Sequence, residues 1–355
     1  MGRTRAVTLE PPHPSAAPAE ACPRPAAAAP APRARRRFAW GALLVVSAAA
    51  VFLALPTLAG VPARLADSCG GWIAAAGVLE LLSAVGFVLL FKLVFAAPVT
   101  WRQGLPAALC GLGASTVLPG GGLIGPSLGA WSQSATKPSP AQLTRSTITF
   151  VILTNAPAAI VLAVVGTLLW LGVPAGPHET ALTIIPALVA LTLLSATWVA
   201  GHACGRQRHP RALGRALAAP GQTISDGMAE ARGLTRDRNW KLNGAVAYYA
   251  FDNAVLWAAF HAFGAAPQLG IIVMGYLVGS LAGALPLPAG LGAVDGGLVG
   301  ALLLYGAPPA PTVGAVLVYR GISLALPIVL GAIGWTWNAA ERPPATGNVW
   351  PAKAS

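Results

Sequence analysis

The sequence predicts an all-α polytopic membrane protein. Of its 355 residues, 55% are hydrophobic and only 10% are charged, whereas soluble globular domains carry about 25% charged residues. The apolar residues form runs long enough to cross a bilayer, and the basic residues lie in blocks between those runs. This distribution is typical of membrane proteins that follow the positive-inside rule. It excludes a soluble enzyme and a nucleic-acid-binding protein, since the latter presents its basic residues on a polar surface.

The N-terminal segment, residues 1–37, is predicted to be a disordered cytoplasmic tail. It contains eight prolines and seven arginines and almost no large apolar side chain, so it cannot bury enough surface to fold. A signal peptide cleaved near Val61-Pro62-Ala63 is the alternative interpretation. The tail is long, however, and the apolar run that follows it is long enough to span the membrane. We therefore expect an integral membrane domain over 38–337 and a second cytoplasmic tail over 338–355.

Six apolar runs are long enough to be membrane-spanning helices, for which about 20 residues are needed. They lie at 38–58, 72–97, 147–172, 181–203, 242–263 and 312–337.

Two further apolar stretches, 103–135 and 268–306, are interrupted in the middle by proline and glycine. The interruptions are Leu118-Pro119-Gly120-Gly121-Gly122 and the segment 285–292. Most arms on either side are too short for the roughly 30 Å hydrocarbon core, given a rise of about 1.5 Å per residue. Each stretch is therefore predicted to form a re-entrant helical hairpin. Its broken backbone must then lie inside the protein or line a wet cavity.

The distribution of Lys and Arg predicts the orientation. With the N-terminus in the cytoplasm, the inner segments are 1–37, 98–146, the basic loop 204–241 and 338–355. They contain 20 of the 23 basic residues, and only Arg64 falls in an outer loop. We therefore expect a multi-pass protein of the cell membrane with both termini in the cytoplasm.

The two halves of the membrane domain, about 38–172 and about 181–337, form an inverted repeat in this interpretation. Each half has a span with a carboxylate, an Ala-Ala-Pro sequence, a hairpin broken at Leu-Pro, and a final span. The carboxylates are Glu80 and Asp252, which precede the Leu-Pro break by 38 and 35 residues. Three spans per half place the halves in opposite orientation, a recurring transporter architecture.

Five charged residues lie where the membrane makes charge costly. We expect Arg320 to pair with Asp295 or Asp252 and to contact an anionic headgroup, while Arg145 plays the matching role at the inner side, with Glu80 as its candidate partner. A static ion pair that fixes helix packing is the alternative. Half-helix N-termini at the two breaks would also bind an anion. The candidate substrate-binding residues are Arg320, Asp295, Asp252, Glu80, Arg145, Pro119, Gly120, Gly121, Gly122, Pro288, Gly290 and Gly292.

The sequence contains no recognisable catalytic or metal-binding motif. The four cysteines are scattered without a Cys-x-x-Cys pair, so neither a disulfide framework nor a zinc site is indicated. HExxH and Walker sequences are absent. We therefore expect no metal, no cofactor and no enzymatic activity.

The second break and the span after it resemble the lysylphosphatidylglycerol synthase transmembrane-region family, which includes the flippase half of the multiple-peptide-resistance proteins. The resemblance rests on Pro288-Ala289-Gly290-Leu291-Gly292-Ala293-Val294-Asp295 followed by Arg320, and on Leu118-Pro119-Gly120 earlier. Asp295 stands where that family usually has Glu. The segment 123–133 lacks the charged residues usual there. No aminoacyl-transferase domain follows residue 337, so the resemblance does not imply lipid synthesis.

The resemblance covers roughly residues 40–337 and implies movement of a lipid or lipid-linked substrate across the bilayer. Together with the predicted repeat, it favours a flippase-like translocase whose partners are membrane lipids. One alternative is a non-transporting scaffold for an envelope lipid synthase or glycosyltransferase, which would be its protein partner. Another is a membrane transferase, which would need Glu80 and Asp252 to converge on one cavity.

Overall fold

The computed structural model is all-helical over the residues that it describes. These residues form ten α-helices and one short 3-10 helix, and no strand occurs among them. All of them belong to one compact unit, Leu43–Ser355. The described ranges are 70–96, 99–133, 138–173, 179–206, 215–264, 266–281 and 292–341.

Within the described ranges, three helices are long and apolar enough to cross a membrane: α3 (Gly70–Val94), α6 (Pro140–Trp170) and α12 (Pro309–Ala340). Helix α6 begins seven residues before its predicted start. Ser139 caps it by accepting a hydrogen bond from the Gln142 backbone N–H at 3.3 Å, and Pro140 occupies its first turn, where proline is well tolerated. The three helices correspond to the runs predicted at 72–97, 147–172 and 312–337.

Helices α7 (Thr180–Arg206) and α9 (Asn243–Ala262) lie where two further spans are predicted, at 181–203 and 242–263. Helix α9 contains 20 residues, but its Asp252 and other polar residues keep its hydropathy below that of the three long apolar helices. The first predicted span, 38–58, lies outside the described residues.

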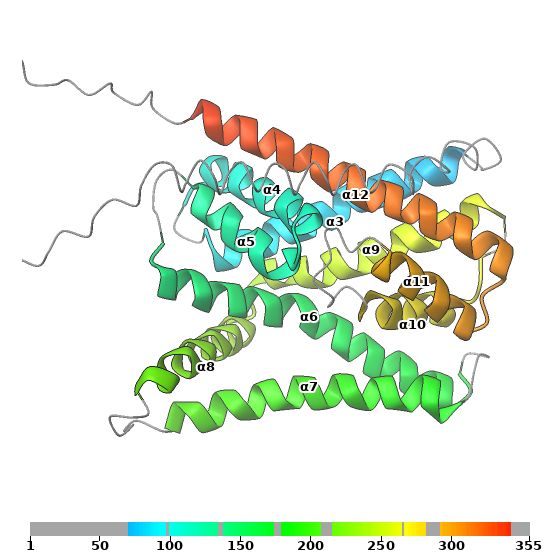
Figure 1. Ribbon diagram of the computed structural model, residues 1–355, viewed down its shortest axis with the longest axis horizontal. Helices are drawn as coiled ribbons and strands as arrows, with labels where there is room; N and C mark the ends of the chain where they lie inside the picture. The colour runs from blue at the N-terminus through cyan, green and yellow to red at the C-terminus, as the bar shows by residue number, and fades with distance from the viewer. Residues whose placement is uncertain are drawn as a thin grey trace, which may run out of the picture. The chain divides into compact units, whose positions relative to one another are not determined.

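The two interrupted stretches form pairs of short helices. The first pair is α4 (Trp101–Val117) and α5 (Gly121–Ser132), and the second is α10 (Leu269–Ser280) and α11 (Ala293–Leu304). Within each pair the two helices pack against one another (Figure 1). The three 12-residue helices are each about 18 Å long, well short of a hydrocarbon core. Most of the second predicted break, 285–292, lies outside the described residues.

The segment predicted as a basic loop, 204–241, contains an amphipathic helix, α8 (Arg215–Arg236), and a short 3-10 helix, η2 (Trp240–Leu242). Helix α8 packs against α6 and α7 (Figure 1). The Thr149 hydroxyl donates a hydrogen bond to the Gly227 carbonyl at 3.0 Å. The segment is therefore docked on the bundle, which a count of its charges alone does not predict.

Helices α3 and α9 cross at two glycines and run antiparallel to each other. A Cβ atom added to Gly86 would lie 2.4 Å from the Tyr248 backbone nitrogen, and one added to Gly244 would lie 2.6 Å from the Gly86 carbonyl oxygen. One turn earlier on α3, the Ser83 hydroxyl donates to the Tyr248 carbonyl at 3.0 Å. In this register, the turn of α3 that precedes Ser83 lies opposite the turn of α9 that follows Tyr248. The first half of the chain thus meets the second at this crossing.

Each short pair also contacts a long helix of the other half of the chain. The first helix of one short pair, α4, packs against α12, and the first helix of the other, α10, packs against α6. Gly113 and Gly331 face each other across the α4–α12 contact, where a Cβ on either would lie 2.7 Å from the Cα of the other. Each long terminal helix of one half therefore supports the short pair of the other half.

We expect Gly86→Ala to destabilise the protein. The added methyl group would meet the backbone of α9, which cannot yield as a flexible side chain can, and overpacking of this kind costs about 1–3 kcal/mol. Gly77→Ala, on the same helix and with no atom within 4 Å of the added Cβ, should leave stability unchanged or raise it slightly. Thermal unfolding of the purified variants in detergent, followed by circular dichroism, compares them. Equal melting temperatures would contradict the close crossing.

Candidate functional site

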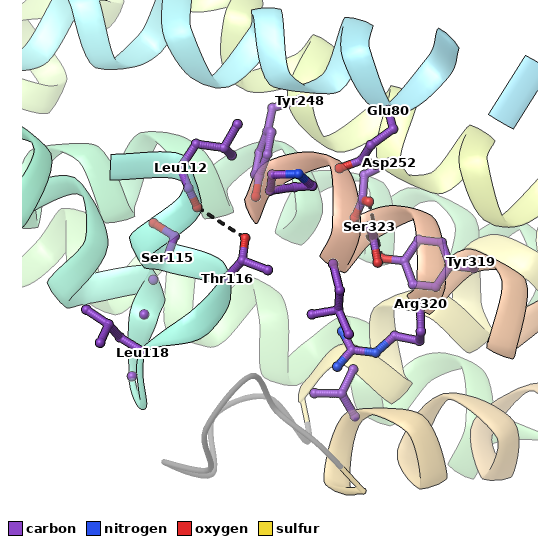
Figure 2. Close-up of a pocket in the computed structure, with 16 residues that line it drawn as sticks. Glu80, Leu112, Ser115, Thr116, Leu118, Tyr248, Asp252, Tyr319, Arg320 and Ser323 are labelled. Atoms are coloured by element: carbon purple, nitrogen blue, oxygen red, sulfur yellow. Dashed lines mark hydrogen bonds between the residues drawn. The ribbon is translucent and has the colours of Figure 1, made fainter. Parts of the chain in front are cut away.

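A cavity of about 260 Å³ lies where helices from both halves of the chain meet. Its walls come from α3, α4, α9 and α12, together with the beginnings of α5 and α11. The charged residues and Tyr319 lie on one side, and the α4 hydroxyls lie on the other (Figure 2). The polar residues that line it are Glu80, Ser115, Thr116, Tyr248, Asp252, Tyr319, Arg320 and Ser323.

Asp252, near the middle of α9, is held by two phenol groups from other helices. The Tyr276 hydroxyl of α10 donates to Oδ2. The Tyr319 hydroxyl of α12 lies 3.1 Å from Oδ2 and 3.2 Å from Oδ1. A carboxylate away from water requires such donors, since an unpartnered buried charge is strongly unfavourable. Asp252 therefore links α9, α10 and α12.

Tyrosine is concentrated around this carboxylate. The chain has five tyrosines. Besides the two donors, Tyr248 lines the cavity one turn before Asp252, and the ring of Tyr249 lies 5.7 Å from that of Tyr276. Four of the five tyrosines therefore surround a single acidic residue.

Arg320, the residue after Tyr319, is paired with Asp295 at the start of α11. Its Nε lies 2.5 Å from Asp295 Oδ1, and both side chains are largely buried. The other carboxylate oxygen, Oδ2, accepts a hydrogen bond from the Gly292 backbone N–H at 3.1 Å. Gly292 has a φ of +77°, which glycine adopts without steric cost. Asp295 thus fixes the first turn of α11 and orients the guanidinium that lines the cavity.

Glu80, on α3, lies opposite Asp252 in the antiparallel register described above. Its side chain is 5% exposed, and Oε2 has no hydrogen-bond partner among the described residues. Both carboxylates line the same cavity, where two negative charges would repel each other. Ser323 Oγ, which also lines the cavity, is another buried polar atom without a described partner. The cavity therefore contains unsatisfied polar atoms as well as a paired charge.

The break between α4 and α5 forms another wall of the cavity. Gly120 turns the chain with a φ of +65°, and α5 then folds back so closely that a Cβ on Gly121 would lie 1.9 Å from the Ser115 carbonyl oxygen. Only glycine allows this approach. The first turn of α5 thereby begins at the cavity, which Gly120, Gly121 and Gly122 line.

The structure brings most of the predicted site residues together but not all of them. Glu80, Asp252, Arg320 and the three glycines of the first break line the cavity. Asp295 joins them through its ion pair with Arg320, and Gly292 through its hydrogen bond to Asp295. Pro119 lies in the turn between α4 and α5 and is not one of the lining residues. Two predicted residues, Pro288 and Gly290, lie outside the described residues.

Arg145 lies away from this site. It is in the second turn of α6, where its Nε is 3.0 Å from Glu230 Oε2 of α8, and its side chain is 45% exposed. The structure therefore does not bring Arg145 to Glu80, the pairing considered from the sequence. The reason is that α8, which the sequence analysis takes as a loop, supplies a nearer carboxylate.

Sequence reasoning also missed the tyrosines and the hydroxyl-bearing wall of α4. The sequence does indicate two of the tyrosines, because Tyr248 precedes Asp252 by one helical turn and Tyr319 directly precedes Arg320. Tyr276 gives no such indication, since its contact with Asp252 depends on how α10 packs. Within the described ranges, no cluster of His, Cys, Asp and Glu has the geometry to hold a metal ion.

Comparison with known proteins identifies the family. The profile of the lysylphosphatidylglycerol synthase transmembrane region matches residues 39–331, which is most of the chain, so the chain belongs to this family. No curated protein matches the sequence. The family resemblance inferred from the two breaks and Arg320 is confirmed, and it makes this chain a multi-pass membrane protein linked to lipid metabolism.

We expect the Arg320–Asp295 pair to show strong coupling in a double-mutant cycle. Asp295→Ala leaves a guanidinium largely buried and should cost roughly 3 kcal/mol or more, while Arg320→Ala combined with it should recover part of that loss. The exposed Arg102–Glu341 pair, at 3.7 Å, is the matched control and should contribute about 0–1 kcal/mol. Denaturant unfolding in detergent measures all the variants. Additive losses at Arg320 and Asp295 would contradict a direct interaction.

Proposed function

We propose that this member of the lysylphosphatidylglycerol synthase transmembrane-region family translocates an anionic lipid or lipid-linked substrate across the cell membrane. The observation that carries the proposal is the position of Arg320. Its guanidinium lines a cavity between the two halves of the chain, where a charge is too costly to be retained without compensation. A paired arginine beside a cavity can exchange its protein carboxylate for a lipid phosphate, which it binds with similar geometry.

Two helix beginnings add to the attraction for an anion. The first turn of α5, at Gly120 to Gly122, and Val294 of α11 both line the cavity with Arg320. Helix N-termini carry partial positive charge and unpaired backbone N–H groups. A phosphate placed between them and the guanidinium would receive donors from both halves of the protein.

The architecture proposed with this function has six spans and two re-entrant hairpins in an inverted repeat. Three features support it: the short helices of each pair, the crossing of α3 with its counterpart α9, and the matched contacts of α4 with α12 and α10 with α6. In such an arrangement one half can rock against the other, exposing a central site alternately to each side. The surplus of basic residues in the inner segments supports cytoplasmic termini.

We expect Arg320→Ala to slow lipid movement about ten- to a hundredfold, because a hydrogen bond to a charged partner contributes about 1.5–3 kcal/mol. The assay uses the purified chain in liposomes with fluorescently labelled phosphatidylglycerol, whose outer-leaflet label is quenched by an impermeant reductant. Labelled phosphatidylcholine tests dependence on headgroup charge. The matched control is Arg102→Ala, whose side chain is exposed and outside the cavity.

Translocation by the unaltered chain with no effect of Arg320→Ala would remove Arg320 from the mechanism. Absence of translocation by the unaltered, folded chain would reject the proposed function itself.

A further inference from the structure

The cavity and its surroundings carry more acidic than basic side chains. Glu80, Asp252 and Asp295 provide three carboxylates, and the described residues around the cavity provide one guanidinium, that of Arg320. Asp295 is bonded directly to that guanidinium and caps α11 as well. Arg320 therefore provides only limited electrostatic stabilisation to the other two carboxylates, Glu80 and Asp252.

The neighbours of Glu80 offer little compensation for a negative charge. Helix α3 packs against α4, α6, α9, α12 and η2. Around the cavity, α4 contributes hydroxyl groups, and α6 is not represented among the described lining residues. The basic residues Lys92 and Lys241 lie near Trp101, about 18 Å from Glu80 along α3, given 12 residues at 1.5 Å. The titratable groups that face Glu80 are Tyr248 and Asp252 of α9 and Tyr319 and Arg320 of α12.

The hydrogen bonds distinguish the two carboxylates. Asp252 receives hydroxyl donors from two tyrosines, an arrangement that favours its ionised form. Glu80 is 5% exposed, lines the cavity, and has an oxygen with no described partner. Two carboxylates that repel each other away from water cannot both ionise readily, so one retains a proton. The partners favour Asp252 as the anion and Glu80 as the protonated acid.

We propose that Glu80, together with Asp252, forms a proton-binding site that couples proton movement to lipid translocation. The coupling rests on the proposed function, whereas the proton site itself does not. In the loading step, a proton from water on one side of the membrane bonds to a Glu80 carboxylate oxygen and forms a neutral acid. In the release step, that O–H bond breaks and the proton passes to water on the other side. No oxidation or covalent transfer to the lipid is involved.

Coupling follows from the shared cavity. A lipid phosphate at Arg320 brings negative charge close to Glu80 and Asp252, so it favours the protonated form of Glu80. By linkage, protonation of Glu80 favours phosphate binding to the same extent. Proton and anionic lipid are therefore expected to bind together and to move in the same direction.

The first experiment tests the proton site without transport. Infrared spectra of the purified chain in nanodiscs are recorded between roughly pH 5 and 9, a range that brackets shifted buried carboxyl groups. We expect a carbonyl band of a protonated carboxylic acid that disappears as the pH rises. Glu80→Gln, which keeps size and hydrogen-bonding shape, should remove the band. Asp252→Asn should shift its midpoint, and the exposed control Glu179→Gln should leave it unchanged.

The second experiment tests coupling in liposomes with labelled phosphatidylglycerol. A gradient of about one pH unit is a tenfold difference in proton concentration and should accelerate lipid movement by up to about tenfold. Glu80→Gln should abolish that dependence. Acceleration by a sodium gradient at constant pH, with none by a pH gradient, would overturn the proposal in favour of a sodium site.

The two readouts separate the possible failures. A titrating band assigned to Glu80 without any lipid movement would reject the proposed function and retain the proton site. Lipid movement that depends on Arg320 but not on pH, in a protein without the band, would retain the function and overturn the proton site.

Discussion

The constraint on which this structure depends is that a charge inside the membrane must be compensated by the protein itself. Arg320 shows how the chain meets it. The guanidinium binds Asp295, and Asp295 in turn caps the first turn of α11. The residue beside Arg320, Tyr319, donates to Asp252 together with Tyr276. One set of polar contacts therefore connects α9, α10, α11 and α12, and removing any member takes a partner from another.

Much of the fold was predictable because hydrophobic length and proline-glycine interruptions are local properties of the sequence. The runs that became α3, α6 and α12, and the short helices around the first break, follow from them. The Arg320–Asp295 contact was also accessible, since intramembrane charges have few possible partners. The docking of α8 beside Arg145 was not, because it depends on packing between helices far apart in the chain. The same holds for Tyr276, whose role is visible only once α10 lies against α9.

The family relationship and the geometry of the cavity give complementary information. The family profile covers 39–331 and indicates a membrane protein linked to lipid metabolism without identifying the groups that act. The cavity brings the candidate groups together, and its surplus of carboxylates over guanidinium is not evident from the family alone. In the proposed anion site, an ionised Glu80 would repel the substrate, whereas a protonated Glu80 would not.

Helices α3 and α9 cross at glycines, and the register between them determines whether Glu80 faces Asp252. At Gly86 and Gly244 the backbones of the two helices lie against each other. Sliding α3 by one helical turn, about 5.4 Å, would move Glu80 from the level of Asp252 to that of Tyr248 or Leu256. Such a ratchet exchanges a repelling carboxylate for an uncharged neighbour. A shear of one turn between α3 and α9 would thus change the electrical environment of a single side chain.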